Sequence, residues 1–194
     1  ALGATLFYGD EWIQQQFDTP NANQKTFIEY GLNNFGNGYY TLPLLGGMFL
    51  YGSLAKKERP FNTALSGVKA FTLSTIVTRI LKYSFNRSRP YENDGSAFYS
   101  GPTSPFSLSL PSGHTTAAFA VAAVLSKNYK HKLLIPIASF TLATGVGVAR
   151  VWSNEHWASD VFVGALVGWS VGTIVSNIDC SNKKSSFKIE GNGI

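Results

Sequence analysis

Residues 133 to 176 read LLIPIASFTLATGVGVARVWSNEHWASDVFVGALVGWSVGTIVS, and the fold class can be predicted from them. Two apolar runs of helix length, residues 133 to 151 and about 160 to 176, flank a short polar segment. Small residues at close spacing, such as Gly145 and Gly147 or Gly164 and Gly168, let neighbouring helices approach closely. The pattern therefore predicts closely packed helices.

Other helix-length segments share the apolar character of this stretch. They occupy residues 39 to 55, 64 to 85 and 115 to 126, and two half-apolar segments occupy residues 9 to 17 and 23 to 34. Gly, Pro and Asn separate these pieces, and none reads as a run of strands. We predict an all-α bundle of about six helices in a single domain over residues 1 to 194. Residues 177 to 194 form a polar, basic C-terminal tail, either disordered or docked against a membrane or a partner.

The composition bears on whether these helices cross a membrane. Hydrophobic residues make up 44% of the chain and charged residues only 14%, against roughly 25% in a soluble domain. A spanning helix needs about 20 mostly apolar residues, and only residues 133 to 148 and 161 to 176 approach that length. The mean hydropathy of +0.02 is low for five or six spans. These features favour a water-soluble or membrane-associated bundle over an integral membrane protein.

Charge, cysteine content and the N-terminus give weaker indications. The net charge of +5 favours anionic partners, but the cations form no single run of the kind that binds nucleic acid, so we expect no nucleic acid partner. Cys180 is the only cysteine, which excludes an intramolecular disulfide and a multi-cysteine metal site. The chain starts with Ala1 and not Met, which fits an exported, periplasmic or envelope protein and equally a trimmed chain.

The first of three polar patches lies at the end of the segment 64 to 85. Lys82 is followed by Arg89-Pro90, in a chain that uses few charges. Because a helix cannot run through Pro90, Arg89 is expected on an extended segment, where it and Lys82 converge on one anion. The alternative is a helix end whose cations complement the helix dipole.

The second patch is Pro111-Ser112-Gly113-His114, immediately before an apolar run. Ser112 and Gly113 stand where a helix starts, so free backbone N–H groups and a hydroxyl would face an anion, as in phosphate sites at helix N-termini. His114 on the first turn is then placed to donate a proton to a leaving group. The alternative is a serine N-cap with an incidental histidine.

The third patch is Arg150, His156 and Asp160. A histidine and an aspartate four residues apart lie on one helix face, so the carboxylate can accept a hydrogen bond from one ring nitrogen and leave the other free to attack. This is the logic of a catalytic triad with histidine itself as the nucleophile. The alternative is a surface His-Asp pair.

Together the patches resemble, in order, the three signature motifs of the type 2 phosphatidic acid phosphatase and vanadium haloperoxidase superfamily. The matching residues are Lys82, Arg89 and Pro90, then Pro111, Ser112, Gly113 and His114, then Arg150, His156 and Asp160. The resemblance covers residues 64 to 176. The third motif usually opens Ser-Arg, whereas Ala149 precedes Arg150 here, which puts one hydroxyl contact to the phosphate in doubt.

The resemblance implies a metal-independent phosphatase of the lipid phosphatase branch, with no cofactor and its active site at the helix ends. In such an enzyme, His156 attacks phosphorus, Asp160 holds its ring, and His114 protonates the leaving alkoxide and later activates water. The groups expected around the phosphate oxygens are Lys82, Arg89, Ser112, Gly113 and Arg150. Because His114 must start protonated and His156 neutral, we expect a bell-shaped pH profile near or below neutral.

The expected substrate is a lipid phosphomonoester or diphosphate, such as phosphatidic acid, phosphatidylglycerol phosphate, an isoprenyl diphosphate or a lipid A phosphate. The alternative is a broad-specificity soluble acid phosphatase acting on small phosphomonoesters. A vanadium-dependent haloperoxidase is less favoured, because such members of the superfamily are longer as a rule. A non-enzymatic membrane-associated scaffold would require three ordered motif matches to be accidental.

The segment from residue 92 to 110, rich in Ser, Gly and Pro, lies between two motifs and either covers the site or merely connects helices. Aromatic residues near the motifs, namely Tyr91, Phe98, Trp152 and Trp157, are candidates for a substrate entrance, although core packing or an interfacial belt explains the two tryptophans equally well.

Overall fold

The structure is a computed structural model that describes residues 2–17, 20–92 and 108–191. These residues form helices and no strand, so the all-α prediction is confirmed. The α-helices are α1 (Leu2–Gln15), α2 (Ala22–Thr26), α3 (Asn33–Gly36), α4 (Thr41–Leu54), α5 (Glu58–Phe85), α6 (Gly113–Asn128), α7 (Leu134–Trp152) and α8 (Ala158–Gly191). A π-helical turn over Phe27–Leu32 joins α2 to α3, and a 3-10 turn covers Pro90–Glu92.

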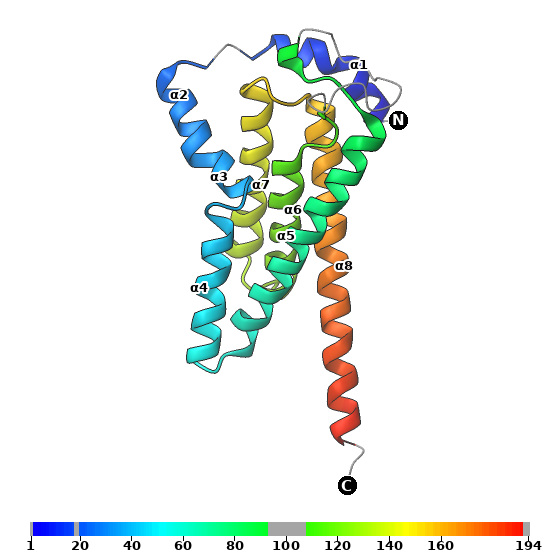
Figure 1. Ribbon diagram of the computed structural model, residues 1–194. Coiled ribbons are helices and arrows are strands. Elements are labelled where there is room, and N and C mark those ends of the chain that lie inside the picture. The colour runs from blue at the N-terminus through cyan, green and yellow to red at the C-terminus, as the bar shows by residue number, and fades with distance from the viewer. Residues whose placement is uncertain (1, 18–19, 93–107, 192–194) are drawn as a thin grey trace.

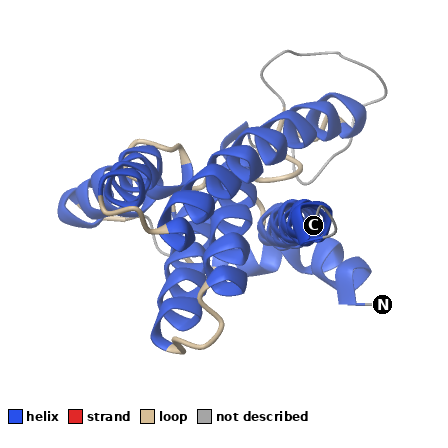
Figure 2. Ribbon diagram, turned by 90° about the horizontal axis from the view of Figure 1, so that it is seen from below, coloured by secondary structure: helices blue, strands red, loops and turns tan. Residues whose placement is uncertain are grey.

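Helices α4 to α8 run side by side, and α1 lies across one end of this bundle (Figure 1). Helix α6 occupies the centre, because it contacts α5, α7 and α8. Seen from below, α8 points toward the viewer with α1 behind it, in keeping with the direct contact between these two helices (Figure 2). Helix α1 thus meets the start of α8 at one end of the bundle, while the C-terminus lies at the opposite end (Figure 1).

Glycines bring the backbones of α6 and α8 into contact. A Cβ atom built on Gly168 or Gly172 would lie 2.2 Å from the carbonyl oxygen of Thr116 or Ala120, respectively. A Cβ on Gly164 would lie 2.8 Å from the carbonyl oxygen of Ser112. The predicted close approach at Gly164 and Gly168 is therefore confirmed.

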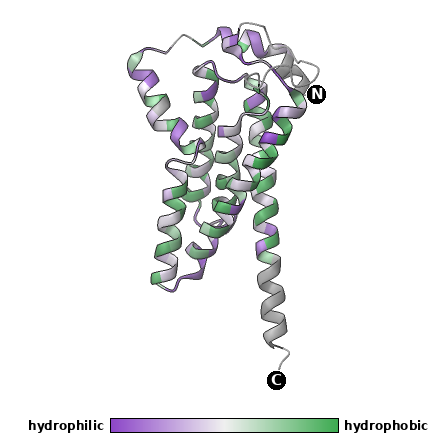
Figure 3. Cartoon of the chain, viewed as in Figure 1, coloured by the Kyte–Doolittle hydropathy of each residue, from purple (hydrophilic) through white to green (hydrophobic). Residues whose placement is uncertain are grey.

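Three helices are long and apolar enough to cross a membrane: Glu58–Phe85, Leu134–Trp152 and the Ala158–Cys180 part of α8. Apolar residues colour much of their length (Figure 3). The expectation that only two segments approach spanning length was wrong for α5, which has 28 residues and an 18-residue window of mean hydropathy 1.3. The segment carries a charge at Lys69, whose ammonium pairs with Asp179 of α8 at 2.7 Å. An apolar helix can tolerate a charge that its neighbour compensates.

The polar tail predicted from residue 177 onward continues α8, which runs without a break to Gly191. The segment from residue 92 to 110 lies mostly outside the described residues, as does Phe98. The predicted start of the second long helix, residue 64, was late, since α5 begins at Glu58.

Candidate active site

All the residues singled out in the three patches gather at one end of the bundle. Helix α5 delivers Lys82 in its last turn and α7 delivers Arg150 in its last turn, while α6 begins with Gly113 and His114. Asn86, in the left-handed conformation with φ 43°, ends α5 and turns the chain. The ends of three helices and the connections between them therefore build the site.

His156 and Asp160 form a buried pair. Nδ1 of His156 lies 3.6 Å from Oδ2 of Asp160 and 3.4 Å from the hydroxyl oxygen of Ser109. That hydroxyl donates to Oδ2 of Asp160 at 2.5 Å, and the backbone N–H of Trp157 donates to the same oxygen at 3.0 Å. Nδ1 thus faces the carboxylate, which leaves Nε2 as the nitrogen available for attack.

The pair does not share a helix face, so that part of the prediction was wrong. His156 lies in the connection before α8, and Asp160 lies in the first turn of that helix. The chain turns at Asn154, which has φ 59°, and the backbone N–H groups of Glu155 and His156 both donate to the carbonyl oxygen of Arg150, at 3.1 and 3.2 Å. A four-residue spacing brings histidine and aspartate together here through a turn followed by a helix start.

A buried arginine that the sequence patches did not include holds the other side of Asp160. Nη1 of Arg87 donates to Oδ1 of Asp160 at 2.7 Å and to the hydroxyl of Ser159 at 2.6 Å. Nη2 of Arg87 donates to Asp10 of α1 at 2.6 Å, and Asp10 also accepts from the backbone N–H of Ser159 at 2.9 Å. The arginine and both carboxylates are fully buried. The sequence did contain an indication of this residue, because Arg87 stands two residues before Arg89 in a chain with few charges.

Three cations face the space next to His156. Nζ of Lys82 donates to the carbonyl oxygens of Leu108 and Ser109. The guanidinium groups of Arg89 and Arg150 both contact Oε2 of Glu155, at 2.5 and 3.1 Å. Lys82 and Arg150 are buried, so they are positioned by the fold and not by solvent.

The Nε atoms of Arg89 and Arg150 are buried donors without a hydrogen-bond partner among the described residues. A buried N–H group left without a partner is costly, and native proteins retain few of them. Two such donors on neighbouring guanidinium groups fit an anion-binding site that a phosphate group completes.

The start of α6 has free hydrogen-bonding capacity. Ser112 is its fully buried N-cap residue, yet the hydroxyl makes no capping bond and instead accepts from the hydroxyl of Thr115 at 3.0 Å. A Cβ on Gly113 would meet only Thr78, at an ordinary 3.5 Å, so protein packing does not explain the glycine. The backbone N–H of Ser112 donates to the carbonyl oxygen of Asp160 at 3.0 Å, which ties α6 to α8.

His114 and His156 lie outside the three segments that could cross a membrane. Burial lowers the pKa of His156 well below its usual 6.5, and Lys82, Arg150 and Arg89 lower it further. Burial also lowers the pKa of His114 to about 3, followed by the effects of Arg150, Lys82 and Arg89. The site therefore favours neutral imidazole at both positions until an anion offsets the cations.

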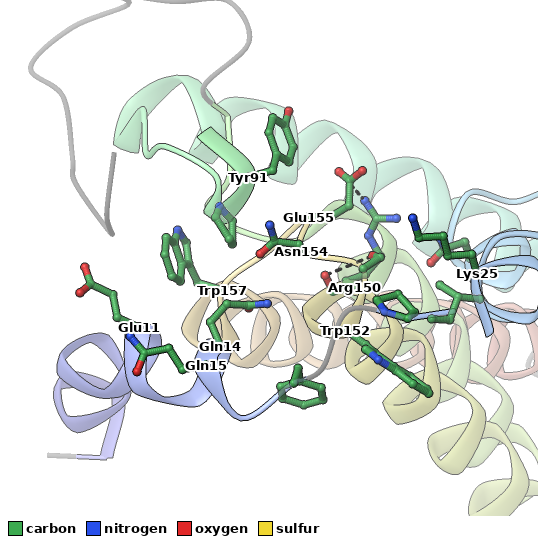
Figure 4. Close-up of a pocket in the computed structure, with 16 residues that line it drawn as sticks. Glu11, Gln14, Gln15, Lys25, Tyr91, Arg150, Trp152, Asn154, Glu155 and Trp157 are labelled. Carbon is green, nitrogen blue, oxygen red and sulfur yellow. Dashed lines mark hydrogen bonds and ion pairs between the residues drawn. The ribbon is translucent and has the colours of Figure 1, made fainter. Parts of the chain in front are cut away.

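A cavity of about 920 Å³ borders the site at Pro90, Arg150 and Glu155, and neither His114 nor His156 lines it (Figure 4). Arg150 and Glu155 lie on one side of it and Glu11 of α1 on the other. Among the expected entrance aromatics, Tyr91, Trp152 and Trp157 do line the cavity. Polar lining residues include Gln14, Gln15, Lys25 and Asn154. The cavity is large enough for a phosphate together with a polar head group.

Comparison with known proteins agrees with this arrangement. The family model of the PAP2 superfamily matches residues 63–183. A lipid A 1-phosphatase of Porphyromonas gingivalis is 42% identical over 94 residues, a match that covers 48% of this chain and only 18% of that protein. A decaprenylphosphoryl-5-phosphoribose phosphatase of Mycobacterium tuberculosis is 30% identical over 151 residues, covering 76% of this chain and 77% of that protein.

Two solved structures have the same fold. The crystal structure of Aquifex aeolicus LpxE superposes with a TM-score of 0.63 at 30% identity, covering 90% of this chain and 94% of that one. A transmembrane PAP2 type phosphatidylglycerolphosphate phosphatase of Bacillus subtilis has the same TM-score at 23% identity, with 95% and 93% covered, and supports the fold alone. Because the family model matches more than half of the sequence and the three motifs meet in one site, the chain belongs to the PAP2 superfamily.

Proposed function

We propose that this protein is a membrane-associated phosphatase that hydrolyses lipid phosphomonoesters or diphosphates through a phosphohistidine on His156. The proposal is carried by the buried Nε donors of Arg89 and Arg150, which have no hydrogen-bond partner among the described residues and lie beside a histidine held by a carboxylate. The named relatives, a lipid A 1-phosphatase and a decaprenylphosphoryl-5-phosphoribose phosphatase, support the lipid class. The substrate carries an apolar chain in each of these lipid classes.

In the first half of the reaction, Nε2 of His156 attacks phosphorus, and the bond from phosphorus to the ester oxygen breaks as the bond to nitrogen forms. Asp160 stabilises the positive charge that develops on the ring through Nδ1, 3.6 Å from its Oδ2. His114 gives its proton to the departing alkoxide. In the second half, His114 takes a proton from water, whose oxygen attacks phosphorus and releases His156.

The phosphate oxygens receive hydrogen bonds from Lys82, Arg89, Arg150, the hydroxyl of Ser112 and the backbone N–H of Gly113. Fixed donors of this kind stabilise the charge that spreads over the oxygens in a phosphoryl-transfer transition state. No step in this scheme requires a metal ion, since the cations and the histidines supply both the charge and the protons.

The low pKa of His114 determines where its proton comes from. With a pKa of about 3, the imidazole is neutral near pH 7 in the absence of an anion. A bound phosphate group opposes the effect of Arg150, Lys82 and Arg89 and raises that pKa. A monoanionic substrate can bring the proton with it, so binding and protonation of His114 are coupled.

The placement of cations supports a site on the non-cytoplasmic side. Helix α5 runs toward the site and α6 runs away from it, so the α4–α5 and α6–α7 connections lie at the far end. These two connections and their flanks hold Lys56, Lys57, Arg59, Lys127, Lys130 and Lys132. At the site end, Lys25 is the one lysine or arginine among the described residues up to Tyr40, and the further cations Lys82, Arg87, Arg89 and Arg150 belong to the candidate site itself. Cytoplasmic connections of membrane proteins carry the excess of lysine and arginine, so we assign the far end to the cytoplasm.

Labelling of Cys180, the single cysteine, tests this orientation. It is exposed on the far half of α8, so a membrane-impermeant maleimide should modify it only after cells are permeabilised. In a Cys180→Ser background, a Lys25→Cys variant should react on spheroplasts without permeabilisation. The reverse pattern would place the active site in the cytoplasm.

Phosphate release by the purified protein in EDTA tests the activity. The substrates are a soluble aryl phosphate and long-chain phosphatidic acid or isoprenyl diphosphate in mixed micelles, with His156→Ala as the inactive control. A clear preference for the lipids supports the proposal, and equal turnover would instead favour a broad-specificity phosphatase. Release from neither substrate would refute both and turn attention to vanadate chemistry.

A further inference from the structure

The residue next to the nucleophile occupies the arginines that the proposed function assigns to the phosphate. One carboxylate oxygen of Glu155, Oε2, lies 2.5 Å from Nη1 of Arg89 and 3.1 Å from Nη2 of Arg150. The two guanidinium groups come from separate parts of the chain, the segment after α5 and the last turn of α7. Glu155 therefore bridges two of the motifs by its side chain.

A carboxylate and a phosphate present the same chemistry to these arginines. Both are anionic oxygen acceptors that match the guanidinium fork. One N–H donor therefore cannot make a full hydrogen bond to a carboxylate and to a phosphate at the same time. The Glu155 contact does not engage Nε of either arginine, which has no partner in the part of the chain that the structure describes, so it satisfies only part of their donor capacity. A phosphate has more oxygens and can engage the remaining donors as well.

Exposure to solvent also distinguishes the side chain of Glu155 from that of Arg150. The Glu155 side chain is 35% exposed and lines the cavity, whereas that of Arg150 is only 9% exposed. Figure 4 shows Glu155 at the cavity wall, with its carboxylate directed to Arg150. When an anion enters, the carboxylate can turn into the cavity while the buried arginine stays in place.

We propose that Glu155 is a specificity-determining residue whose carboxylate competes with phosphate for Arg89 and Arg150. This proposal rests on the proposed function and deepens it. A ligand must displace the carboxylate, so inorganic phosphate binds weakly, while a substrate that also makes contacts along the cavity or with the lipid phase still binds. The site thereby favours the ester over the free phosphate that it releases.

The alternative role for Glu155 is to hold the arginines in a binding-competent arrangement, and it predicts an effect of opposite sign. If Glu155 only positions the arginines, then its loss weakens phosphate binding. If it competes with phosphate, then its loss strengthens phosphate binding. Direct binding of orthophosphate to the full-length protein in detergent micelles, measured by titration calorimetry, separates these roles without any turnover.

For the Glu155→Gln variant, which keeps the size and most hydrogen-bonding capacity of the side chain, we expect orthophosphate to bind about three- to tenfold more tightly, the scale of one partly exposed charge pair. Glu11→Gln is the matched control, because Glu11 lines the same cavity on the side away from Arg150. It removes the same charge and should change the dissociation constant by less than about twofold. Unchanged or weaker binding by Glu155→Gln, equal tightening by both variants, or no measurable binding by any protein would overturn the proposal.

Thermal unfolding provides the second readout. Without phosphate, Glu155→Gln should melt below the wild type, since Lys82, Arg89 and Arg150 then repel one another without the carboxylate. Added orthophosphate should raise its melting temperature by more than it raises that of the wild type, because tighter binding stabilises more. A smaller rise in the variant would contradict competition. Absence of phosphatase activity in the EDTA assay would refute the proposed function but leave both readouts measurable.

Discussion

The guanidinium of Arg87 lies 2.7 Å from Oδ1 of Asp160, in an ion pair whose two side chains are both fully buried. The same guanidinium pairs with Asp10 at 2.6 Å, so one arginine serves two buried carboxylates. Asp160 in turn faces His156, which makes α1 a remote support of the candidate nucleophile. The network fixes the side of Asp160 that is turned away from the imidazole.

Removing this arginine should destabilise the protein strongly. In Arg87→Met, Asp10 and Asp160 lose their shared cation, and breaking a buried pair in this way costs about 3–5 kcal/mol. The measurement is thermal or denaturant unfolding in detergent micelles. Arg79→Met, which removes an exposed arginine of α5, should change stability by less than about 0.5 kcal/mol. Equal stability of the two variants would show that the buried pair contributes little.

His114→Ala should lower turnover by about 10²- to 10⁴-fold for an alkyl phosphate, because the leaving alkoxide then lacks its proton donor. The loss should be much smaller for p-nitrophenyl phosphate, whose leaving group departs without protonation. Rates for both substrates, compared between variant and wild type, provide the measurement. A loss of equal size for both substrates would argue that His114 binds phosphate and does not act as the acid.

The rate of phosphate ester hydrolysis should rise as the solution becomes more acidic. The pKa of His156 lies well below 6.5, so the nucleophile stays neutral as the pH falls through 6.5. The pKa of His114 is about 3, so its protonated fraction in the free enzyme grows about tenfold for each pH unit lost above that value. We therefore expect kcat/KM to increase from pH 8 toward pH 5, and His114→Ala to lack most of that increase. A flat profile in the wild type from pH 4 to 9 would contradict this scheme.

Gly168→Ala should destabilise the protein by about 1–3 kcal/mol, because the new Cβ would lie 2.2 Å from the carbonyl oxygen of Thr116 and must push α6 and α8 apart. Gly46→Ala is the matched control, since a Cβ there meets nothing within 4 Å. That change should leave stability unchanged or raise it by up to about 1 kcal/mol through helix propensity. Thermal unfolding of both variants in one detergent provides the comparison, and a harmless Gly168→Ala would refute backbone contact.

The site could be located from the sequence because its motifs stand where apolar segments end. Lys82, Ser112 and Arg150 each mark a helix terminus, and local periodicity places such termini well. Contacts between residues that are distant in the sequence could not be predicted in this way. Asp10 meets Ser159 across 149 positions, and Arg87 meets Asp160 across 73, contacts that only the packed fold defines.

The compensation of charges within apolar helices also could not be predicted from the sequence. Lys69 lowers the apparent hydropathy of α5, and nothing nearby in the sequence reveals that Asp179 compensates it. The turn at Asn154 likewise hides the true relation between His156 and Asp160, since a spacing of four residues suggests one helix face. Their proximity was predicted, but the backbone path that produces it was not.

The glycine contacts between α6 and α8 have a mechanical consequence. His114 and Asp160 stand on the first turns of these two helices, and Gly164, nearest to them, lets the backbone of α8 rest against that of α6 at Ser112. The spacing between the starts of these two helices is thus set by main chain against main chain, with no side chain of Gly164 between them. We therefore expect forces on the outer faces of the bundle to leave that spacing nearly unchanged.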